Sequence, residues 1–391
     1  LHRRRGQDGV EEDLLVTVYA HINTVPNGST GGIMMKEHRE LLAVGEESFA
    51  FWGRGRDAED EHEMRFASDL EVKADVLQTR LDGKAGFHSK AATKRLLARL
   101  DKINPDVVHL HNLHGYYLNV EMLFEWLAEH DCKVEWTLHD CWAFTGHCAY
   151  FTYVKCAQWK DRCAYGKPCP QLDTYPKTIS AISCKWNFEQ KKRLFNLVPA
   201  ERMKLITPSR WLEGLVKQSF LSKYPVEVRH NAIDRTVFKP IPGDFRERHD
   251  IGDRFMILGV ASPWTERKGL TDFVRLAGEL DSEKYAIVLV GLNEKQVAAM
   301  PDSVVALGHT DSAQELAAIY TAADVFFNPT HEDNFPTVNL EAEACGTPVI
   351  TYDTGGSGEA IHLASSVAVD DFSNSVSRLK LMAGGVSESY C

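Results

Sequence analysis

The 391-residue sequence lacks several patterns that would decide its class at once. No uninterrupted apolar run approaches the roughly 20 residues that a membrane-spanning helix requires. Basic residues are in the minority, with 44 Lys and Arg against 55 Asp and Glu, so the broad basic face that nucleic-acid binding needs is not expected. There is no short-period repeat, and a composition that is 44% hydrophobic and 25% charged excludes a mainly disordered or collagen-like chain.

The N-terminus also lacks the apolar stretch of a secretory signal, because LHRRRGQDGVEEDLL turns from basic to acidic residues. We therefore expect a cytoplasmic protein. The sequence has nine cysteines, and an odd number without a signal favours a reducing compartment. Their distribution is uneven, since all but two fall within residues 132–184.

Hydrophobic periodicity divides the chain into two stretches in which buried-strand and helical patterns alternate. In the first stretch, strands are predicted at 14–22, 46–52, 106–112, 133–140, 203–209 and 226–233, and helices at 33–44, 91–103, 122–130 and 210–221. In the second stretch, strands are predicted at 255–261, 285–291, 324–329 and 348–353, and helices at 269–280, 312–323 and 336–345. Such alternation predicts parallel sheets. We therefore expect two doubly wound, Rossmann-like α/β domains, residues 1–238 and 239–391, facing a cleft that binds ligands outside the carboxyl ends of the strands.

The most informative segment is NPTHEDNFPTVNLEAEACGTPVITYDTGGSGE, residues 328–359. Asp333 lies in the loop after a predicted strand, and Glu341 lies eight residues later, inside the next predicted helix. Backbone N–H groups near Asn334–Thr337, at the helix N-terminus, would suit the oxygens of a phosphate. The two carboxylates would suit a hydroxyl-rich ligand, because each can accept two O–H hydrogen bonds. An isolated pair of this kind is more often a helix-capping acid and a solvated helix residue.

The whole segment closely resembles the donor-site signature of retaining GT-B glycosyltransferases, glycosyltransferase family 4. The match includes two acids separated by seven residues, the sequence CGTPV and a Gly-Gly loop that ends in Glu359. The resemblance implies that Asp333 contacts the donor sugar and that Glu341 holds the ribose diol. It also implies a donor site completed by Asn334, Phe335, Gly355 and Gly356. The family usually has Glu where this chain has Asp333, and Glu332 is one residue out of register.

Two adjacent cations, Arg267 and Lys268, follow the predicted strand 255–261 in the segment GVASPWTERKGL. Cations are unfavourable at a helix N-terminus, so two of them there indicate a nearby anion, with a solvated basic pair as the alternative. A nucleoside diphosphate gains negative charge as it leaves a sugar, and fixed cations stabilise that charge. The family resemblance assigns Lys268 to the diphosphate. Many members have an arginine near the position of Ser262, and Arg267 is the candidate to replace it here.

In the first stretch, the loop NGSTGG links the first predicted strand to a helix. Glycines there would let backbone N–H groups approach a phosphate, and the resemblance implies that Gly31 and Gly32 meet the donor phosphates; a plain turn is the alternative. His139 and Asp140 end the predicted strand 133–140. The family has a histidine at this strand end near the reacting sugar carbons, so His139 is expected to orient the donor sugar or the acceptor, with Asp140 as its support.

Three more histidines, His109, His111 and His114, occur at the end of the predicted strand 106–112. The spacing places His109 and His111 on one face of the strand and His114 in the following loop, so we expect them to line the acceptor pocket rather than to bind zinc. No Asp-x-Asp pair ends a predicted strand. We expect no metal in catalysis, because cationic side chains and N–H groups would neutralise the leaving group.

Residues 141–176 interrupt the alternation with a segment rich in Cys, Trp, Tyr and Pro. Its cysteines are six to eight residues apart, so none forms the close C-x2-C pair of common zinc modules. Cys148, Cys156, Cys163 and Cys169 could close one structural zinc site, and buried reduced thiols or disulfides are the alternatives. A similar insertion occurs in some polysaccharide-building bacterial members of the family, and we expect this one to shape acceptor binding.

The segment SCKWNFEQKKRLFNLV, residues 183–198, mixes large apolar residues with lysines and an arginine. A basic amphipathic helix can lie on an anionic membrane surface. Peripheral contact with the inner face of the cell membrane would suit an enzyme that uses polyprenyl-linked acceptors. The alternative is a packed helix with a solvated basic face.

Together, these features imply a retaining glycosyltransferase that moves a hexose from a UDP- or GDP-sugar to a glycan or lipid-linked saccharide in cell-surface polysaccharide synthesis. The leaving phosphate itself would accept the acceptor's proton, and positioning and electrostatic stabilisation would supply the rate. One alternative is a nucleotide-sugar 2-epimerase on the same fold, which needs no acceptor. Another is a catalytically impaired member, because few residues follow Glu359 to form the returning C-terminal helix of GT-B enzymes. A bilobal sugar-binding receptor is disfavoured by the missing signal.

Overall fold

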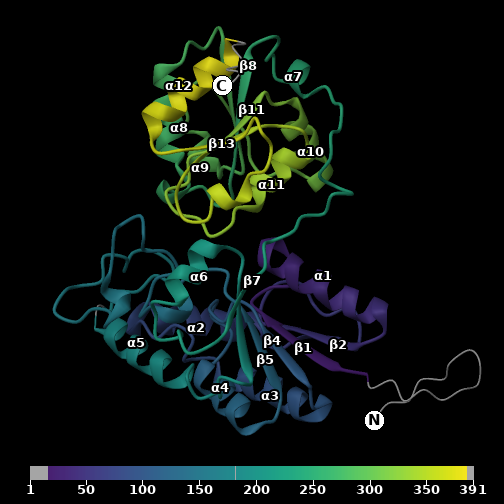
Figure 1. Ribbon diagram of the computed structural model, residues 1–391, viewed down its shortest axis with the longest axis vertical. Helices are drawn as coiled ribbons and strands as arrows, with labels where there is room; N and C mark the ends of the chain where they lie inside the picture. Colours follow the sequence, from purple (N-terminus) through teal and green to yellow (C-terminus); the bar gives the residue numbers. More distant parts are fainter. Residues whose placement is uncertain (1–15, 181, 385–391) are drawn as a thin grey trace, which may run out of the picture. The chain divides into compact units, whose positions relative to one another are not determined.

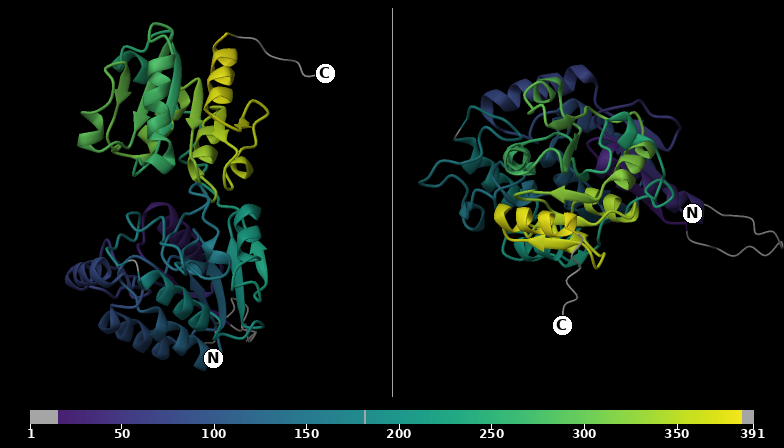
Figure 2. Two further views of the ribbon diagram at one scale, coloured as in Figure 1. Left: turned by 90° about the vertical axis from the view of Figure 1, so that its left-hand side faces the viewer. Right: turned by 90° about the horizontal axis from the view of Figure 1, so that it is seen from above.

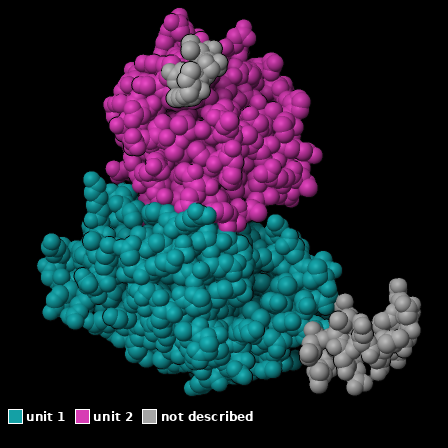
Figure 3. All heavy atoms as spheres, in the orientation of Figure 1, with its two compact units in different colours: residues 1–229 teal, residues 230–391 magenta. Residues whose placement is uncertain are grey.

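The computed structural model describes residues 16–180 and 182–384, and the chain divides into two compact units, residues 1–229 and 230–391 (Figure 1, Figure 3). The division falls a little before the boundary predicted after residue 238. Each unit is a parallel sheet with helices on both faces (Figure 2). The start of the first predicted strand, residues 14 and 15, and the residues after 384, including Cys391, lie outside the described residues.

The first unit has a sheet with the strand order β3-β2-β1-β4-β5-β6-β7, in which neighbouring strands pair in parallel. Its strands are β1 (Val18–Asn23), β2 (Glu47–Trp52), β3 (Glu63–Arg65), β4 (Val107–Leu110), β5 (Lys133–Thr137), β6 (Met203–Thr207) and β7 (Val226–Val228). Its α-helices are α1 (Gly28–Val44), α2 (Asp69–Asp82), α3 (Lys90–Ile103), α4 (Val120–Glu129), α5 (Ser183–Leu194) and α6 (Arg210–Val216). The order reverses at β1 and β4, which makes the carboxyl ends of these strands a topological switch point.

The second unit repeats this plan with the order β10-β9-β8-β11-β12-β13. Its strands are β8 (Phe255–Val260), β9 (Tyr285–Val290), β10 (Val304–Ala306), β11 (Val325–Asn328), β12 (Val349–Tyr352) and β13 (Val367–Val369). Its α-helices are α7 (Phe245–Arg248), α8 (Leu270–Glu279), α9 (Glu294–Val297), α10 (Ala313–Ala322), α11 (Thr337–Ala344) and α12 (Phe372–Ala383). Successive residues of β8 enter different cores: Ile257 packs on one face of the sheet, and Met256 and Leu258 pack on the other. Both faces are therefore covered, as a parallel sheet requires.

Helix α1 begins earlier than its glycines predict. The helix starts at Gly28 rather than near Ile33, so Gly31 and Gly32 lie in its first turns and not in a loop. A Cβ atom at Gly31 would lie 2.6 Å from both the carbonyl carbon of Pro26 and the backbone oxygen of Val25. The glycine is thus required for the close approach of the preceding segment, and this packing overrides the poor helix propensity of glycine.

Helix α5 corresponds to the predicted basic helix, but its apolar side is not available to a membrane. Phe188, Leu194 and the following Phe195 belong to the core of the first unit. Lys191, expected on the solvated face, is buried, and its Nζ donates to the carbonyl oxygens of Trp142 at 2.8 Å and Thr145 at 3.1 Å. The packed-helix alternative therefore describes this element better. Within the described part of the chain, no helix combines the length and apolarity that a membrane crossing needs.

Candidate functional site

In the second unit, the loops after β8, β11 and β12 meet at the carboxyl edge of the sheet. A 3-10 helix, η3 (Glu266–Lys268), follows β8 and ends at Gly269, whose φ is 78°. A Cβ atom on Gly269 would lie 2.2 Å from the backbone oxygen of Pro329, just after β11. Glycine therefore lets the two loops approach, and this contact brings the cations of η3 to the acids that follow β11.

The predicted cations and the first predicted acid lie in direct contact. The Nζ of Lys268 forms an ion pair with the Oδ2 of Asp333, and the guanidinium of Arg267 donates to the backbone oxygen of Glu332. Burial raises the pKa of Asp333, but Lys268, Arg267 and the N–H of Asn334 outweigh that effect and hold it below its ordinary value. Asp333 is therefore an ionised carboxylate that is almost completely buried, with a cation fixed on one oxygen.

The glycine loop after β12 lies against the backbone of the same acid. The N–H of Gly356 donates to the backbone oxygen of Asp333 at 2.9 Å. Gly355 has a φ of 62°, and a Cβ atom there would lie 2.0 Å from that oxygen. Asn334 and Phe335 are buried beside it, and the ring of Phe335 stacks on His230 with 4.7 Å between ring centroids. The structure thus brings together Arg267, Lys268, Asp333, Asn334, Phe335, Gly355 and Gly356.

Glu341, the second predicted acid, lies on α11 and is partly buried. Burial raises its pKa, although hydrogen bonds from Tyr320 and Thr337 act in the opposite direction. The hydroxyl of Tyr320 donates to Oε2 of Glu341 at 3.2 Å. The solvated-residue alternative is therefore wrong for Glu341. Tyr320 comes from α10, and no motif in the sequence pointed to it.

In the first unit, His139 lies two residues beyond the end of β5. Its Nε2 lies 3.2 Å from the Nδ1 of His111, and the two rings stack with an interplanar angle of 12°. Burial lowers the pKa of His139 to about 4, and the nearby His109 adds to this effect, whereas Asp140 opposes it. His139 is thus a neutral imidazole at neutral pH, able to donate or accept a hydrogen bond but not to supply a charge.

Asp140 supports a different histidine from the one expected. Its Oδ2 lies 2.7 Å from the Nε2 of His114, and its Oδ1 accepts the N–H of Trp142 at 2.8 Å. The Nδ1 of His114 in turn lies 3.1 Å from the hydroxyl of Tyr175. Asp140 therefore fixes the loop after β4 to the segment after β5, and its effect on His139 is electrostatic.

His109 and His111 are buried, and Glu37 of α1 lies against both. His109 and His111 do share one face of β4, and β1 places His21 opposite His109. Ligand atoms of His21, Glu37, His109 and His111 lie within 4.8 Å of one another, which is close enough for one divalent cation. His109 already contacts Glu37 through Nδ1 at 3.1 Å and Thr137 through Nε2 at 2.8 Å.

Comparisons with known proteins agree with this geometry. Residues 254–379 match the family model described as Glycosyl transferases group 1. Over 364 residues, 88% of this chain and 85% of the relative, the sequence is 24% identical to WcaC of Escherichia coli (strain K12), named as a colanic acid biosynthesis glycosyl transferase. Sucrose-phosphate synthase from Thermosynechococcus elongatus aligns with a TM-score of 0.68 and 16% identity, covering 94% of this chain and 90% of that chain. Anabaena HepE, in complex with UDP and glucose, aligns with a TM-score of 0.57 and 13% identity, covering 95% and 90%.

The two Rossmann-like units, the pairing of cations with a buried carboxylate and these likenesses define one class of protein. The predicted fold is confirmed as GT-B, with two parallel-sheet units. The chain is a glycosyltransferase, and therefore an enzyme of the transferase class.

Proposed function

We propose that this enzyme is a retaining hexosyltransferase of glycosyltransferase family 4. It moves a hexose from a nucleoside diphosphate sugar to a glycan or lipid-linked saccharide during cell-surface polysaccharide synthesis. The observation that carries the proposal is the Lys268–Asp333 pair at the carboxyl edge of β8 and β11, with Arg267 beside it. The UDP and glucose bound by HepE and the colanic acid pathway in the name of WcaC support the donor class and the setting.

In this proposal, the second unit holds the donor. Lys268 and Arg267 neutralise the diphosphate. Asp333 accepts a hydrogen bond from a sugar hydroxyl through the oxygen that does not face Lys268. Because Asp333 is already ionised, it holds Lys268 in place before the donor arrives, which is the preorganisation that lowers a barrier. Glu341 accepts hydrogen bonds from the ribose hydroxyls. Asn334, Phe335, Gly355 and Gly356 complete the site. The N–H groups of Asn334 and Gly356 hold Asp333 in place, and those of Phe335 and Gly355 face the donor in this proposal.

The first unit contributes neutral groups in this proposal. His139 donates a hydrogen bond to the transferred sugar or the acceptor without adding charge. The N-terminus of α1, with Gly31 and Gly32 in its first turns, offers N–H groups to phosphate oxygens, which is a favourable place for an anion. The acceptor oxygen bonds to the anomeric carbon on the face from which the diphosphate departs. The leaving phosphate lies on the same face and takes the acceptor's proton. No divalent metal is needed for this step, because side-chain cations carry out the neutralisation.

We also place the enzyme in the cytoplasm, at the inner face of the cell membrane. A lipid-linked acceptor would hold it there, and the exposed basic residues of α5, Lys185, Lys192 and Arg193, would face anionic headgroups. Because the apolar side of α5 is buried, this contact would be electrostatic and would weaken as salt is raised.

Donor turnover with and without acceptor tests the proposal. Purified protein is incubated with UDP- and GDP-hexoses, alone or with polyprenyl-linked saccharides, and nucleotide release and the anomeric configuration of the product are followed by NMR. We expect release that depends on the acceptor, and a product with the anomeric configuration of the donor. An epimerised donor without acceptor would identify the 2-epimerase instead. Inversion would refute retention, and a protein that binds donor but never releases nucleotide would be the impaired member.

A further inference from the structure

The cysteine-rich insertion has little regular structure of its own. Between β5 and α5, the described residues form only two short 3-10 helices, η1 (Trp142–Phe144) and η2 (Gln158–Lys160). Phe144, Phe151 and Trp159 pack together on one side of it, with ring centroids 5.1 to 6.3 Å apart. Such a small aromatic cluster is a weak core for a loop of this length, so another element must hold the segment together.

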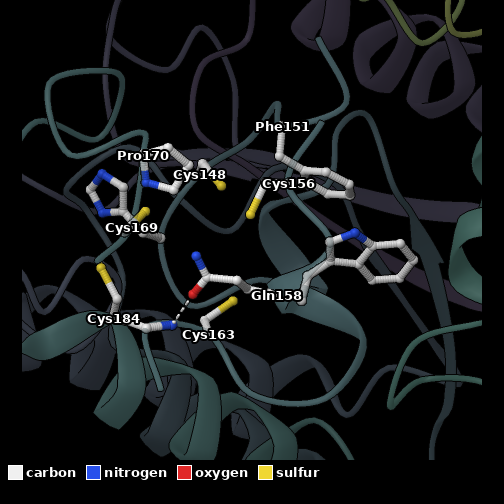
Figure 4. Close-up of a pocket in the computed structure, with 11 residues that line it drawn as sticks. Cys148, Phe151, Cys156, Gln158, Cys163, Cys169, Pro170 and Cys184 are labelled. Carbon is white, nitrogen blue, oxygen red and sulfur yellow. Dashed lines mark hydrogen bonds between the residues drawn. The ribbon is translucent and has the colours of Figure 1, made fainter. Parts of the chain in front are cut away.

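A small cavity next to these aromatic rings is lined by five cysteines and by His147. Cys148, Cys156, Cys163, Cys169 and Cys184 all line it, and Figure 4 shows their side chains around the same space. The cavity leaves about 10 Å³ for the centre of a water-sized sphere, which is room for one small ion. Every described cysteine is a free thiol, so no disulfide joins any of these residues.

Four of the five sulfurs form one mutually interacting set. Cys148, Cys156, Cys163 and Cys169 each lie close enough to the other three to interact electrostatically. Cys184 also hydrogen-bonds with Cys169 and interacts with Cys163. It differs from the other four in its place in the chain, because it belongs to helix α5 and not to the insertion.

Backbone N–H groups point at three of these four sulfurs. The N–H of Gly146 donates to the Sγ of Cys163 at 3.2 Å. The sulfur of Cys156 accepts from the backbone of Gln158, and that of Cys169 accepts from the backbone of Gln171. Donors of this kind stabilise sulfur that carries negative charge, and they orient it toward a metal. A thiol that merely fills a core does not need them.

A buried lysine lies beside the same set. The amine of Lys191 is held between the carbonyl oxygens of Trp142 and Thr145, and it interacts with Cys163 and Cys148. Four thiolates around one divalent ion carry a net charge of about −2, which is costly to bury alone. The amine of Lys191, held by two carbonyl oxygens beside these sulfurs, is placed to balance part of that charge.

We propose that Cys148, Cys156, Cys163 and Cys169 bind one Zn²⁺ ion that folds the insertion, and that Cys184 is not a ligand. Four sulfur ligands around one small space suit the tetrahedral geometry of zinc, with Zn–S distances of about 2.3 Å. Binding would draw the sulfurs inward to those distances. Four protein ligands leave no open position, so the ion is structural and takes no part in sugar transfer. The inference does not depend on the proposed activity.

Metal analysis of the unmodified chain provides the first test. Protein is purified without chelators or nickel resin, in a non-thiol reductant, and its metals are measured by inductively coupled plasma mass spectrometry. We expect about one zinc per chain, released in step with modification of the thiols by a mercurial reagent. Protein without zinc, or with iron in its place, would overturn the proposal. So would zinc that stays bound after all thiols have reacted, because that would place it at His21, Glu37, His109 and His111.

Single substitutions then test which sulfurs are the ligands. Cys163→Ser and Cys169→Ser should lower the zinc content at least about tenfold, since a ligand is lost. Cys184→Ser should keep its zinc, as should the matched control Cys132→Ser outside the insertion. Zinc lost from Cys184→Ser but kept in Cys156→Ser would show that the ligand set is wrong. If the ligand variants fail to fold, cobalt substitution of the unmodified chain provides the readout: thiolate-to-cobalt charge-transfer absorption supports the site, and its absence refutes it.

Discussion

At the level of single residues, the two units give their proposed functional groups different environments: an ion pair in the second unit and a cluster of uncharged histidines in the first. In the second unit, Asp333 is buried and ionised because Lys268 and Arg267 lie beside it. In the first unit, His139 is neutral because it is desolvated among other histidines. In the proposed mechanism, the residues of the second unit therefore neutralise charge, and those of the first unit form uncharged hydrogen bonds.

Replacing His139 should separate sugar transfer from nucleotide binding. His139→Ala should lower the transfer rate on the order of 100-fold, because a positioning contact to the reacting sugar is lost. Nucleotide affinity should change by less than about tenfold, or 1.4 kcal/mol, since the proposed contact of His139 is to the sugar and not to the base or the phosphates. Transfer assays and calorimetric Kd values check this, with His130→Ala as the control. Unchanged transfer would refute the role given to His139.

The buried neutral histidines also predict a pH dependence of stability. An unfolded histidine takes up a proton near its ordinary 6.5, but His139 does so in the fold only near 4. Between these values the unfolded state binds more protons, so stability must fall as the pH falls. His21 and His111, whose pKa values burial also lowers, add to the effect.

The expected slope is up to about 1.4 kcal/mol per pH unit for each such histidine. Urea denaturation at pH 7, 6 and 5 measures the slope, and hydrogen exchange of the amides in β4 and β5 serves as the readout for the first unit. His139→Gln should flatten the slope, because unfolding then takes up about one proton fewer. A first unit that becomes more stable between pH 7 and 5, or a variant with an unchanged slope, would contradict the assignment.

Individual residues were predictable where a motif fixed their spacing. Asp333 and the two loop glycines belong to one signature and Lys268 to a second segment of the same resemblance, and all four meet in the structure. Lys191 was misjudged because a run of basic residues normally faces water, and only the carbonyl groups of the insertion reveal why this one is buried.

At the level of elements, loops of glycine and turn residues hold the proposed donor site on a rigid sheet. Gly269 and Gly355 are the points of closest approach, and both have positive φ. Each allows one loop to touch the backbone of another at the carboxyl edge of the second unit. The geometry of Asp333 therefore depends on the backbone conformation of these two glycines.

Substituting Gly355 should damage the loop that supports Asp333. Gly355→Ala combines a φ of 62° with a Cβ atom 2.0 Å from the backbone oxygen of Asp333. We expect the second unit to lose about 1–3 kcal/mol of stability, with weaker nucleotide binding. Gly278→Ala, in α8 with nothing near its Cβ position, should instead add about 0.5–1 kcal/mol. Denaturant titration of both variants checks this, and equal stabilities would contradict the close approach.

Most elements with buried strands or strongly patterned helices were predictable, and the exceptions have physical causes. Helix α2 was missed because its apolar residues do not mark its buried face: Leu70, Leu77 and Leu81 are exposed, while Asp75 and Thr79 are buried. The start of α1 was missed because glycines normally disfavour a helix. In both elements, tertiary contacts rather than the local sequence pattern determine where the helix forms.

At the scale of the whole molecule, two units with the same sheet plan carry different chemistry. The second unit presents cations and acids at its carboxyl edge, and the first presents a dense set of histidines and the cysteine insertion. The alternation of strands and helices made this plan predictable. The residues that make up the histidine cluster were not predictable, because β1, β4 and α1 bring them together from distant parts of the chain.

Chelation should distinguish a catalytic metal from a structural one. A brief treatment with EDTA should leave transfer activity intact, because Lys268 and Arg267 neutralise the leaving group in the proposed mechanism. The measurement is nucleotide release before and after treatment, with calcium-loaded EDTA as the control. Activity that is lost and then restored by magnesium or manganese would contradict the metal-free mechanism. Slow loss of folded structure together with released zinc would instead reflect the insertion.

The most direct test of the central claim, that the second unit binds a nucleoside diphosphate through Lys268, needs no acceptor. UDP and GDP are titrated calorimetrically into the full chain, into Lys268→Ala and into the control Lys284→Ala, which replaces an exposed lysine of the same unit. We expect one nucleotide to bind, the control to match the unmodified chain, and Lys268→Ala to bind at least about tenfold more weakly, a loss of 1.4 kcal/mol. If neither nucleotide binds, or if Lys268→Ala binds as tightly as the control, the donor site proposed here is wrong.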